Sequence, residues 1–254
     1  MNSLLLSLLL AVAGDPQKME WTVDGVAREA LVFPPSKESS AAPPLVFGFH
    51  GHGGSMQQAS RSFPIQEQWP EAVVVYPQGL PTAGRLTDAE GKRSGWQASA
   101  GDHGDRDLKL VDAILATLKE KYKVDEKRIY ATGHSNGGAF TYLVWVNRPD
   151  LFAAIAPSAA PAPRDLKQAR PCPIFHVAGE KDQVVKFEWQ QRSWAGVRTV
   201  NGCEEQGKEW DKGCTLYPSS KDAPLVTFIH PGGHKYSDEA HALVVKFFKE
   251  QVRK

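Results

Sequence analysis

The sequence predicts an α/β fold, a single domain in which a mostly parallel central sheet carries helices on both faces. Short continuous apolar runs, typical of strands covered on both faces, alternate along the chain with longer segments of helical periodicity. With 254 residues, 41% of them hydrophobic, the chain is long enough for one large domain. No internal repeat or compositional shift marks a boundary to a second domain. Alternation of strands and helices is the pattern of a doubly covered parallel sheet.

Local patterns in the N-terminal half predict a hairpin, two strands, a loop and a helix. Polar and apolar residues alternate around Asp24-Gly25, which is typical of a β-hairpin. Two apolar runs bounded by turn residues predict strands, and a later segment has apolar residues at helical spacing. Between them lies a stretch rich in Gly, Ser, Thr and Asp, which we expect to be a surface loop. In chain order these are the hairpin 21–33, strands 43–49 and 72–79, loop 79–104 and helix 107–123.

The C-terminal half continues the alternation. A strand is followed directly by a serine motif and a helix, and further apolar runs alternate with amphipathic segments. The expected strands are 128–133, 152–159, 172–179 and 224–232, and the expected helices are 136–150, 187–200 and 237–254. The polar stretch around residues 201–223 contains two cysteines and is expected to be a loop.

Charge and composition favour a small or neutral ligand. Lys plus Arg number 30 and Asp plus Glu number 29, which gives a formal charge of +1. Such a balance does not direct a protein to nucleic acid or to anionic lipid, so we expect neither a nucleic-acid nor a membrane partner. We also expect the protein to be a monomer. No CxxC or His-rich spacing suggests a metal site, and we expect no cofactor.

The first residues predict export from the cell. An apolar run of about ten residues ends in Ala11-Val12-Ala13, a small-x-small pattern that precedes signal-peptide cleavage. The run is too short to span a bilayer. We therefore interpret residues 1–13 as a signal peptide, although the amino terminus is its only positive charge, and residues 14–254 as a secreted or periplasmic domain. The alternative is a buried amphipathic starter element.

The three cysteines fit an oxidising compartment. A bridge between Cys203 and Cys214 would close a loop of about a dozen residues, worth about 3 kcal/mol by loop entropy. That pairing is the one we expect. Cys172 precedes an apolar run and is expected to be a lone packed thiol.

The stretch ATGHSNGGA places Ser135 between Gly133 and Gly137. The motif lies where a predicted strand turns into a helix, which is the context of a nucleophile elbow. In such a sharp turn a side chain at either glycine would collide with neighbouring backbone. The elbow exposes the serine hydroxyl and directs the backbone N–H of Asn136 toward a developing oxyanion. The alternative is a small residue in a glycine-rich loop.

A serine nucleophile needs a base and a carboxylate that orients the base. Asp182 lies just beyond the strand 172–179, and His234 lies just beyond the strand 224–232. Glu180 is the rival carboxylate in the same loop. The other candidates are less favoured: Asp211 and Asp222 as solvated groups, His176 and His230 as packed residues, and His241 on the last helix.

The glycine-rich HGHGGS segment follows the strand 43–49 and is the expected source of a second oxyanion donor. We predict the backbone amide of His52, with Gly53 as the fallback, and a tight turn as the structural alternative. Trp96, in the long loop, is a candidate substrate-binding residue that walls an acyl site or stacks on a sugar. Its alternative role is a loop anchor. Trp189 and Trp194 are expected to pack.

These segments together resemble the exported esterases related to polyhydroxybutyrate depolymerases and to feruloyl esterases of carbohydrate esterase family one. The resemblance runs from about Leu45 to the C-terminus, through FHGHGGS, VVVYPQGL, GWQ, DLKLVDAILATLKEKYKVDEKRIYATGHSNGGAF, DLFAAIAPSA, VAGEKDQVV, VNGC and PGGH. It implies an α/β-hydrolase fold and serine esterase activity. It departs at His52, where many relatives carry a Cys, and at Lys109, where an apolar residue is frequent.

Position by position, the resemblance implies Ser135 as nucleophile, Asp182 as orienting carboxylate and His234 as general base, with His52 and Asn136 as oxyanion donors. The expected activity is that of a secreted serine carboxylic ester hydrolase acting on feruloyl or acetyl esters of plant cell-wall polysaccharide. The alternative enzyme is a polyester depolymerase of the polyhydroxybutyrate type. The alternative class is a binding protein that uses a hydrolase scaffold without turnover.

Overall fold

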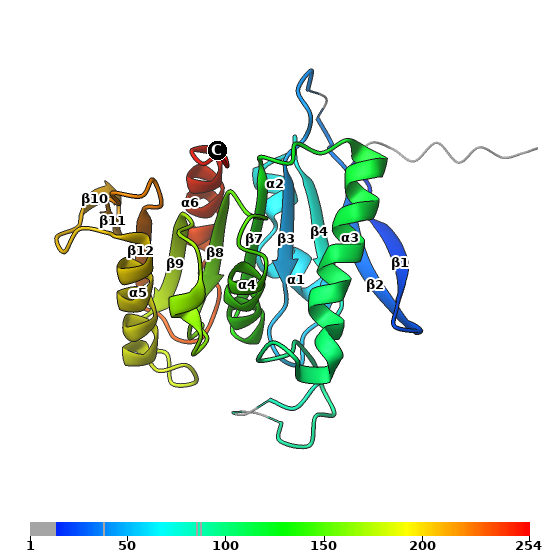
Figure 1. Ribbon diagram of the computed structural model, residues 1–254, viewed down its shortest axis with the longest axis horizontal. Coiled ribbons are helices and arrows are strands. Elements are labelled where there is room, and N and C mark those ends of the chain that lie inside the picture. Colours follow the sequence, from blue (N-terminus) through cyan, green and yellow to red (C-terminus); the bar gives the residue numbers. More distant parts are fainter. Residues whose placement is uncertain (1–13, 38, 85, 87) are drawn as a thin grey trace, which may run out of the picture.

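The structure is a computed structural model that describes residues 14–254 except residues 38, 85 and 87. The signal peptide predicted for residues 1–13 lies outside these described residues. A ten-stranded sheet runs through the molecule with helices on both faces (Figure 1). Its strands are β1 (Gln17–Val23), β2 (Val26–Phe33), β3 (Leu45–Phe49), β4 (Val73–Pro77), β7 (Ile129–His134), β8 (Ala154–Ser158), β9 (Ile174–Gly179), β10 (Lys208–Asp211), β11 (Cys214–Tyr217) and β12 (Leu225–His230).

The central strands are parallel, and an antiparallel hairpin lies at each edge. The strand order is β1-β2-β4-β3-β7-β8-β9-β12-β11-β10. Strands β4, β3, β7, β8, β9 and β12 pair in parallel, whereas β2 joins β4 and β11 joins β12 in antiparallel fashion. A separate short pair, β5 (Leu80–Pro81) and β6 (Ser94–Gly95), lies in the long loop after β4. The predicted mostly parallel sheet is therefore confirmed.

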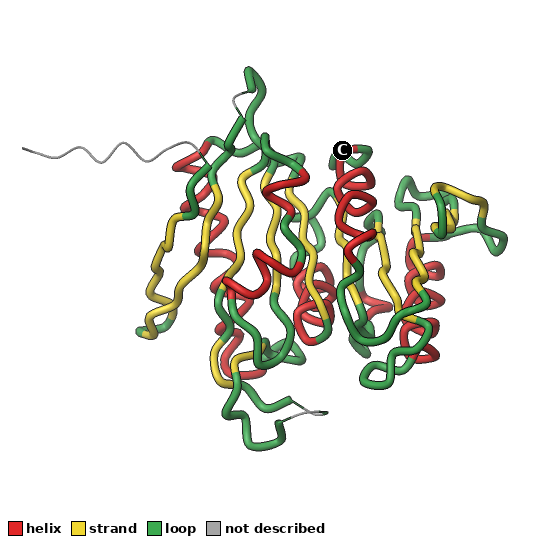
Figure 2. Tube along the Cα trace, turned by 180° about the vertical axis from the view of Figure 1, so that it is seen from behind, coloured by secondary structure: helices red, strands yellow, loops and turns green. Residues whose placement is uncertain are grey.

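The helices form two layers, each over its own apolar cluster. Figures 1 and 2 show α3 (Arg106–Tyr122), α4 (Asn136–Asn147) and α5 (Phe187–Asn201) on one face, and α1 (Met56–Ser62), α2 (Ile65–Gln68) and α6 (Asp238–Lys249) on the other. Two short 3-10 turns, Asp102–Asp105 and Leu166–Gln168, complete the structure. Within the described ranges, no helix is long and apolar enough to cross a membrane.

Most elements lie where the sequence patterns predict them, and α1 is the main addition. It follows the HGHGGS segment, a stretch to which periodicity assigns no element. Its signal is the spacing of Ser55 and Gln58, an N-cap Ser three residues before a Gln. In the structure the Ser55 side chain accepts a hydrogen bond of 3.2 Å from the backbone N–H of Gln58. A capping pattern therefore marks a helix too short to show a period.

The disulfide predicted between Cys203 and Cys214 is absent. The polar stretch that contains these two cysteines is partly a hairpin, formed by β10 and β11. Cys172, Cys203 and Cys214 are all free thiols. Cys214 begins β11 and is buried in the apolar cluster beneath α6, whereas Cys203 packs against the cluster on the opposite face of the sheet. The sheet itself therefore separates the two thiols. Cys172 is 3% exposed, and burial raises the pKa of its thiol, which is consistent with the packed role predicted for it.

A buried ion pair ties the N-terminal hairpin to α3. Arg28 of β2 and Asp107 of α3 lie 2.7 Å apart, with side chains 1% and 0% exposed. The other carboxylate oxygen of Asp107 accepts the backbone N–H of Gln97 at 2.9 Å, and the Gln97 side chain accepts the N–H of Asp107 at 3.1 Å. The long loop after β4 is thereby attached to the body of the sheet at its C-terminal end.

We expect Asp107→Ala to lower the free energy of unfolding by about 3–5 kcal/mol, because it leaves the Arg28 guanidinium buried without its counter-charge. Asp150→Ala is the matched control, since Asp150 pairs with Arg170 on the surface with side chains 69% and 66% exposed. Its expected effect is below about 1 kcal/mol. Urea unfolding of both variants measures the difference, and equal effects would contradict the assignment.

Candidate active site

Ser135 occupies a strained turn between β7 and α4. Its backbone angles are φ 57° and ψ −119°, in a region that residues with a side chain rarely adopt. A Cβ on Gly133 would collide with the carbonyl of Gly137, and a Cβ on Gly137 would collide with the carbonyls of Phe49 and His50. Both glycines are therefore sterically required, as the sequence indicated. The turn is the sharp strand-to-helix elbow that exposes a serine hydroxyl.

The elbow lies at the point where the strand order reverses. From β3 the chain passes to β4 on one side, while β7 and the later parallel strands lie on the other. In open α/β sheets, ligands bind at the carboxyl ends of the strands at such a reversal. The HGHGGS loop follows β3 and the elbow follows β7, so the two glycine-rich turns are neighbours because β3 and β7 are paired strands.

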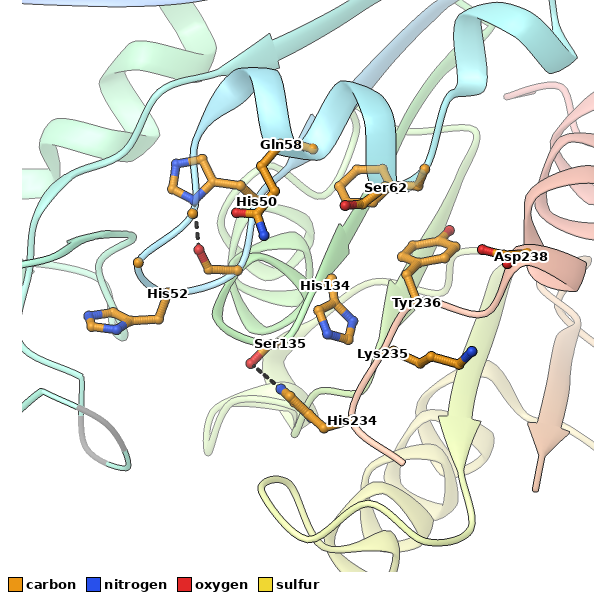
Figure 3. A pocket seen from close by; sticks show the side chains of 15 residues that line it. His50, His52, Gln58, Ser62, His134, Ser135, His234, Lys235, Tyr236 and Asp238 are labelled. Atoms are coloured by element: carbon orange, nitrogen blue, oxygen red, sulfur yellow. Dashed lines mark hydrogen bonds between the residues drawn. The ribbon is translucent and has the colours of Figure 1, made fainter. Parts of the chain in front are cut away.

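Three side chains from different strand ends meet in this region. The Oγ atom of Ser135 lies 2.9 Å from Nε2 of His234, a contact drawn in Figure 3. Nδ1 of His234 lies 2.8 Å from Oδ2 of Asp182. Because a carboxylate only accepts hydrogen bonds, Nδ1 carries the proton and Nε2 is left to accept from the Ser135 hydroxyl. The sequence places these residues after β7, β9 and β12, and the fold brings them together.

The Asp182 carboxylate is held in position by the start of the segment that follows it. Its Oδ1 accepts the backbone N–H groups of Val184 and Val185, each at 2.9 Å. Its Oδ2 also faces the side-chain amide of Gln190 at 3.3 Å, and the Asp182 side chain is 0% exposed. Glu180, the rival carboxylate, is exposed. The geometry therefore favours Asp182 as the partner of His234.

The remaining histidines near the sheet have other partners. His176 is buried and its Nδ1 lies 2.8 Å from the Tyr142 hydroxyl, whereas His241 donates from Nε2 to the carbonyl of Ser62 at 2.9 Å. His230 is 5% exposed at the end of β12. His134, on which the sequence patterns gave no prediction, stands beside the triad with its ring 4.8 Å from that of His234. Burial lowers the pKa of His134 to about 3, so its ring is neutral at physiological pH.

The HGHGGS loop is held by its own histidine. Nε2 of His50 accepts the backbone N–H of Gly79 at 2.9 Å, so the ring proton is on Nδ1, which donates to the Gly51 carbonyl at 2.7 Å. The same carbonyl accepts the N–H of Gly54 at 2.9 Å. Burial lowers the pKa of His50 to about 4, which keeps its ring neutral. The peptide between Gly51 and His52 therefore has a fixed orientation.

The predicted oxyanion donors differ in what surrounds them. Gly53, the fallback, donates its N–H to the Ser94 carbonyl at 2.6 Å, so the fallback is wrong. In a trans peptide the N–H points opposite to the C=O, so the His52 N–H points away from the groups that bind the Gly51 carbonyl. The His52 ring donates from Nε2 to the Thr82 carbonyl at 2.9 Å. Asn136 begins α4, where its N–H is one of the first unpaired donors of a helix.

The prediction that Trp96 binds substrate is corrected by the structure. Trp96 is 1% exposed, and its indole N–H donates to the His50 carbonyl at 2.8 Å. Its ring stacks on Phe140 at 5.0 Å and meets Phe49 edge-on at 5.3 Å. A side chain enclosed on all sides offers no surface to a ligand, so Trp96 is the loop anchor that the sequence left as its alternative.

A pocket of about 420 Å³ opens beside Ser135 and His234. The side chains that line it, drawn in Figure 3, come from the HGHGGS loop, α1, the elbow, the segment that leads into α6 and the first residue of α6. Sequence patterns missed most of these residues because single side chains in short connecting segments carry no periodic signal. They include Gln58, Ser62, Lys235, Tyr236 and Asp238. No group of three or more His, Cys, Asp or Glu in the described part of the chain could hold a metal ion.

This arrangement defines the class of protein. A mostly parallel sheet with helices on both faces, an elbow serine after one strand, and a histidine and a carboxylate after later strands constitute the α/β-hydrolase fold. A solved structure described as acetyl xylan esterase from Aspergillus awamori superimposes with a TM-score of 0.70, covering 93% of this chain and 99% of that one at 14% identity. The fold is therefore shared over almost the whole length.

Sequence comparison adds named relatives. The chain is 32% identical over 185 residues to the bifunctional acetylxylan esterase/xylanase XynS20E of Neocallimastix patriciarum, and 29% identical over 157 residues to feruloyl esterase B of Piromyces equi. The matches cover 72% and 52% of this chain, but only 25% and 29% of the relatives' own lengths. A model of the prolyl oligopeptidase family matches residues 93–164. The resemblance to esterases of the feruloyl type that the sequence indicated is confirmed.

We expect acid to destabilise the protein through its enclosed histidines. Burial lowers the pKa of His176 to about 4, against about 6.5 for an exposed imidazole. Between these values the unfolded chain binds a proton that the folded protein does not bind. The free energy of unfolding is therefore highest above pH 6.5 and decreases as the pH falls toward 4.

His176→Gln should reduce the number of protons taken up on unfolding by about one. The slope of the free energy of unfolding against pH should therefore decrease by about 1.4 kcal/mol per pH unit. Urea unfolding at several pH values between 4 and 7 measures the slope. His103→Gln, at an exposed position, is the control and should leave the slope as in the parent protein. A slope unaltered by the His176 change would show that His176 binds protons equally in the folded and unfolded states.

Proposed function

We propose that this chain is a serine carboxylic ester hydrolase that works through an acyl-enzyme on Ser135. One observation carries the proposal: the Ser135 hydroxyl, the His234 ring and the Asp182 carboxylate are linked by hydrogen bonds of 2.9 and 2.8 Å beside a pocket. A series of hydrogen bonds of this kind raises the nucleophilicity of a serine hydroxyl, which is a poor nucleophile on its own.

The geometry supports a two-step mechanism. Nε2 of His234 accepts the proton as Ser135 Oγ attacks the ester carbonyl, while Asp182 holds the ring and stabilises its positive charge. The oxyanion that forms on the carbonyl oxygen receives hydrogen bonds from the backbone amides of His52 and Asn136. His234 then returns the proton to the departing alcohol, and a water molecule repeats the sequence on the acyl-enzyme.

The ester that we propose is an acetyl or feruloyl group on plant cell-wall polysaccharide. The relatives named acetylxylan esterase and feruloyl esterase support this substrate class. The pocket agrees with it, because Gln58, Ser62, Lys235 and Asp238 offer donors and acceptors to a hydroxyl-rich alcohol. The alternatives remain a polyester of the polyhydroxybutyrate type and a binding protein without turnover.

A cell-wall substrate lies outside the cell, so the proposal includes export directed by residues 1–13, with residues 14–254 as the esterase domain. We further propose that the domain acts as a monomer with no nucleic-acid or membrane partner. The nearly balanced charge of the chain supports the absence of a nucleic-acid or anionic-lipid partner.

Variants at the two neighbouring acidic residues test the roles in the triad. Asp182→Asn should lower kcat for p-nitrophenyl acetate by about ten thousandfold, because the amide favours the wrong tautomer of His234. Glu180→Gln is the matched control and should keep the activity of the parent protein. Ser135→Ala should abolish covalent labelling by a fluorophosphonate as well as turnover. Full turnover in Ser135→Ala would refute the mechanism.

A panel of esters tests the substrate class. We expect kcat/KM for acetylated xylan to exceed the corresponding value for polyhydroxybutyrate by at least about tenfold, since a polar pocket favours a sugar alcohol over an apolar chain. Turnover of methyl ferulate tests whether the acyl side of the site accepts a feruloyl group. Ser135→Ala measures the uncatalysed background for each ester. Turnover confined to polyhydroxybutyrate would favour the polyester alternative. Absence of both turnover and fluorophosphonate labelling would favour the binding protein.

A further inference from the structure

The side chain of Asn136 makes two hydrogen bonds with the main chain of Trp96. Its Oδ1 accepts the backbone N–H of Trp96 at 2.8 Å, and its Nδ2 donates to the backbone carbonyl of the same residue at 3.2 Å. The pair of bonds imitates the pairing of one strand with another. It joins the first residue of α4, directly after the elbow, to the long loop that follows β4.

The same short segment holds the HGHGGS loop from the other side. The Trp96 indole N–H donates to the His50 carbonyl at 2.8 Å, and the Ser94 carbonyl accepts the N–H of Gly53 at 2.6 Å. Gly95 lies between them, where a Cβ would stand 2.8 Å from the His52 ring and 3.0 Å from Asn136 Oδ1. Only a glycine permits the two loops to approach this closely.

Residues 94–96 therefore form a bridge between the two backbone segments that supply the oxyanion donors. One end of the bridge is bonded to Asn136, whose own amide is one donor. The other end is bonded to His50 and Gly53, which flank the peptide that supplies the amide of His52. The two donors belong to loops that follow different strands, and residues 94–96 are bonded to both loops.

We propose that Asn136 and Trp96 are positioning residues. Their side chains keep the backbone N–H groups of His52 and Asn136 at the separation and direction that stabilise the oxyanion in the transition state. This inference rests on the proposed esterase function. It predicts a loss confined to the chemical step, because amides that are misplaced by a fraction of an ångström still bind the neutral ester but stabilise the oxyanion poorly.

Asn136→Ala removes the two hydrogen bonds to the main chain of Trp96 and leaves the backbone amide at position 136 in place. We expect kcat for p-nitrophenyl acetate to fall by about ten- to a hundredfold while KM changes by less than about threefold. The inhibition constant of a trifluoromethyl ketone, which forms an oxyanion on Ser135, should rise by the same factor as kcat falls.

The chain contains a matched control for this variant. The side chain of Asn201 makes the same pair of bonds with the main chain of Cys172, accepting its N–H at 3.2 Å and donating to its carbonyl at 2.7 Å. Asn201→Ala removes an equivalent pair of bonds at the far end of α5. It should lower the melting temperature but leave kcat and the inhibition constant within about twofold of the parent values.

Trp96→Phe keeps an aromatic ring in the cluster but removes the donor to His50 together with part of the volume of the indole. We expect a decrease in kcat of about tenfold, with a parallel rise in the inhibition constant of the ketone. Trp145→Phe is the control, because Trp145 is also buried and donates its indole N–H to the Arg170 carbonyl at 3.0 Å. That change should lower thermal stability alone.

The outcomes separate this inference from the proposed function. If the parent protein hydrolyses p-nitrophenyl acetate and the Asn136 and Trp96 variants behave as their controls do, the positioning role is wrong and the esterase function stands. A rise in KM without a fall in kcat would also overturn the positioning role. If the parent protein has no turnover and does not react with fluorophosphonate, the proposed function fails and this inference fails with it.

Discussion

The site depends on a close contact between backbones at the carboxyl ends of β3 and β7. Gly137, in the first turn of α4, lies against the carbonyls of Phe49 and His50, and a side chain there would collide with both. This contact places the start of a helix, with its unpaired N–H groups, beside the loop that follows β3. The nucleophile turn and the HGHGGS loop are neighbours for this reason, and the strained φ of Ser135 is stabilised by the packing around it.

Around this contact, the polar groups of the site are fixed by hydrogen bonds to the backbone. The Asp182 carboxylate is held by the N–H groups of Val184 and Val185, and the Gly51 carbonyl is held by the neutral ring of His50. Groups fixed before the substrate arrives need little reorganisation during the reaction, which is the main physical source of electrostatic stabilisation in enzymes. The neutral state of His50 and His134 follows from burial and keeps additional positive charge away from the ring of His234.

The long loop after β4 is hydrogen-bonded to the residues around this site even though its composition is that of a surface loop. The side chains of Asp107 and Asn136 accept the backbone N–H groups of Gln97 and Trp96, respectively. The indole N–H of Trp96 in turn donates to the His50 carbonyl. The buried Arg28–Asp107 pair connects this chain of contacts to the N-terminal hairpin, so a hairpin at the edge of the sheet supports a loop beside the nucleophile. In the proposed mechanism, stability and catalysis are thus coupled through a few buried polar contacts.

The sequence alone determined the order and type of most elements, because apolar periodicity and turn residues are local properties of the chain. It also identified Ser135, Asp182 and His234 as candidates, because a nucleophile, a carboxylate and a base must each follow a strand in such a fold. Local patterns did not determine the partners of cysteines and aromatic residues. Only the tertiary structure decided that the sheet separates Cys203 from Cys214, and that Trp96 is an anchor enclosed by Phe49 and Phe140. These outcomes depend on which face of the sheet a residue reaches and on which distant residues surround it, and neither is encoded by its neighbours in the sequence.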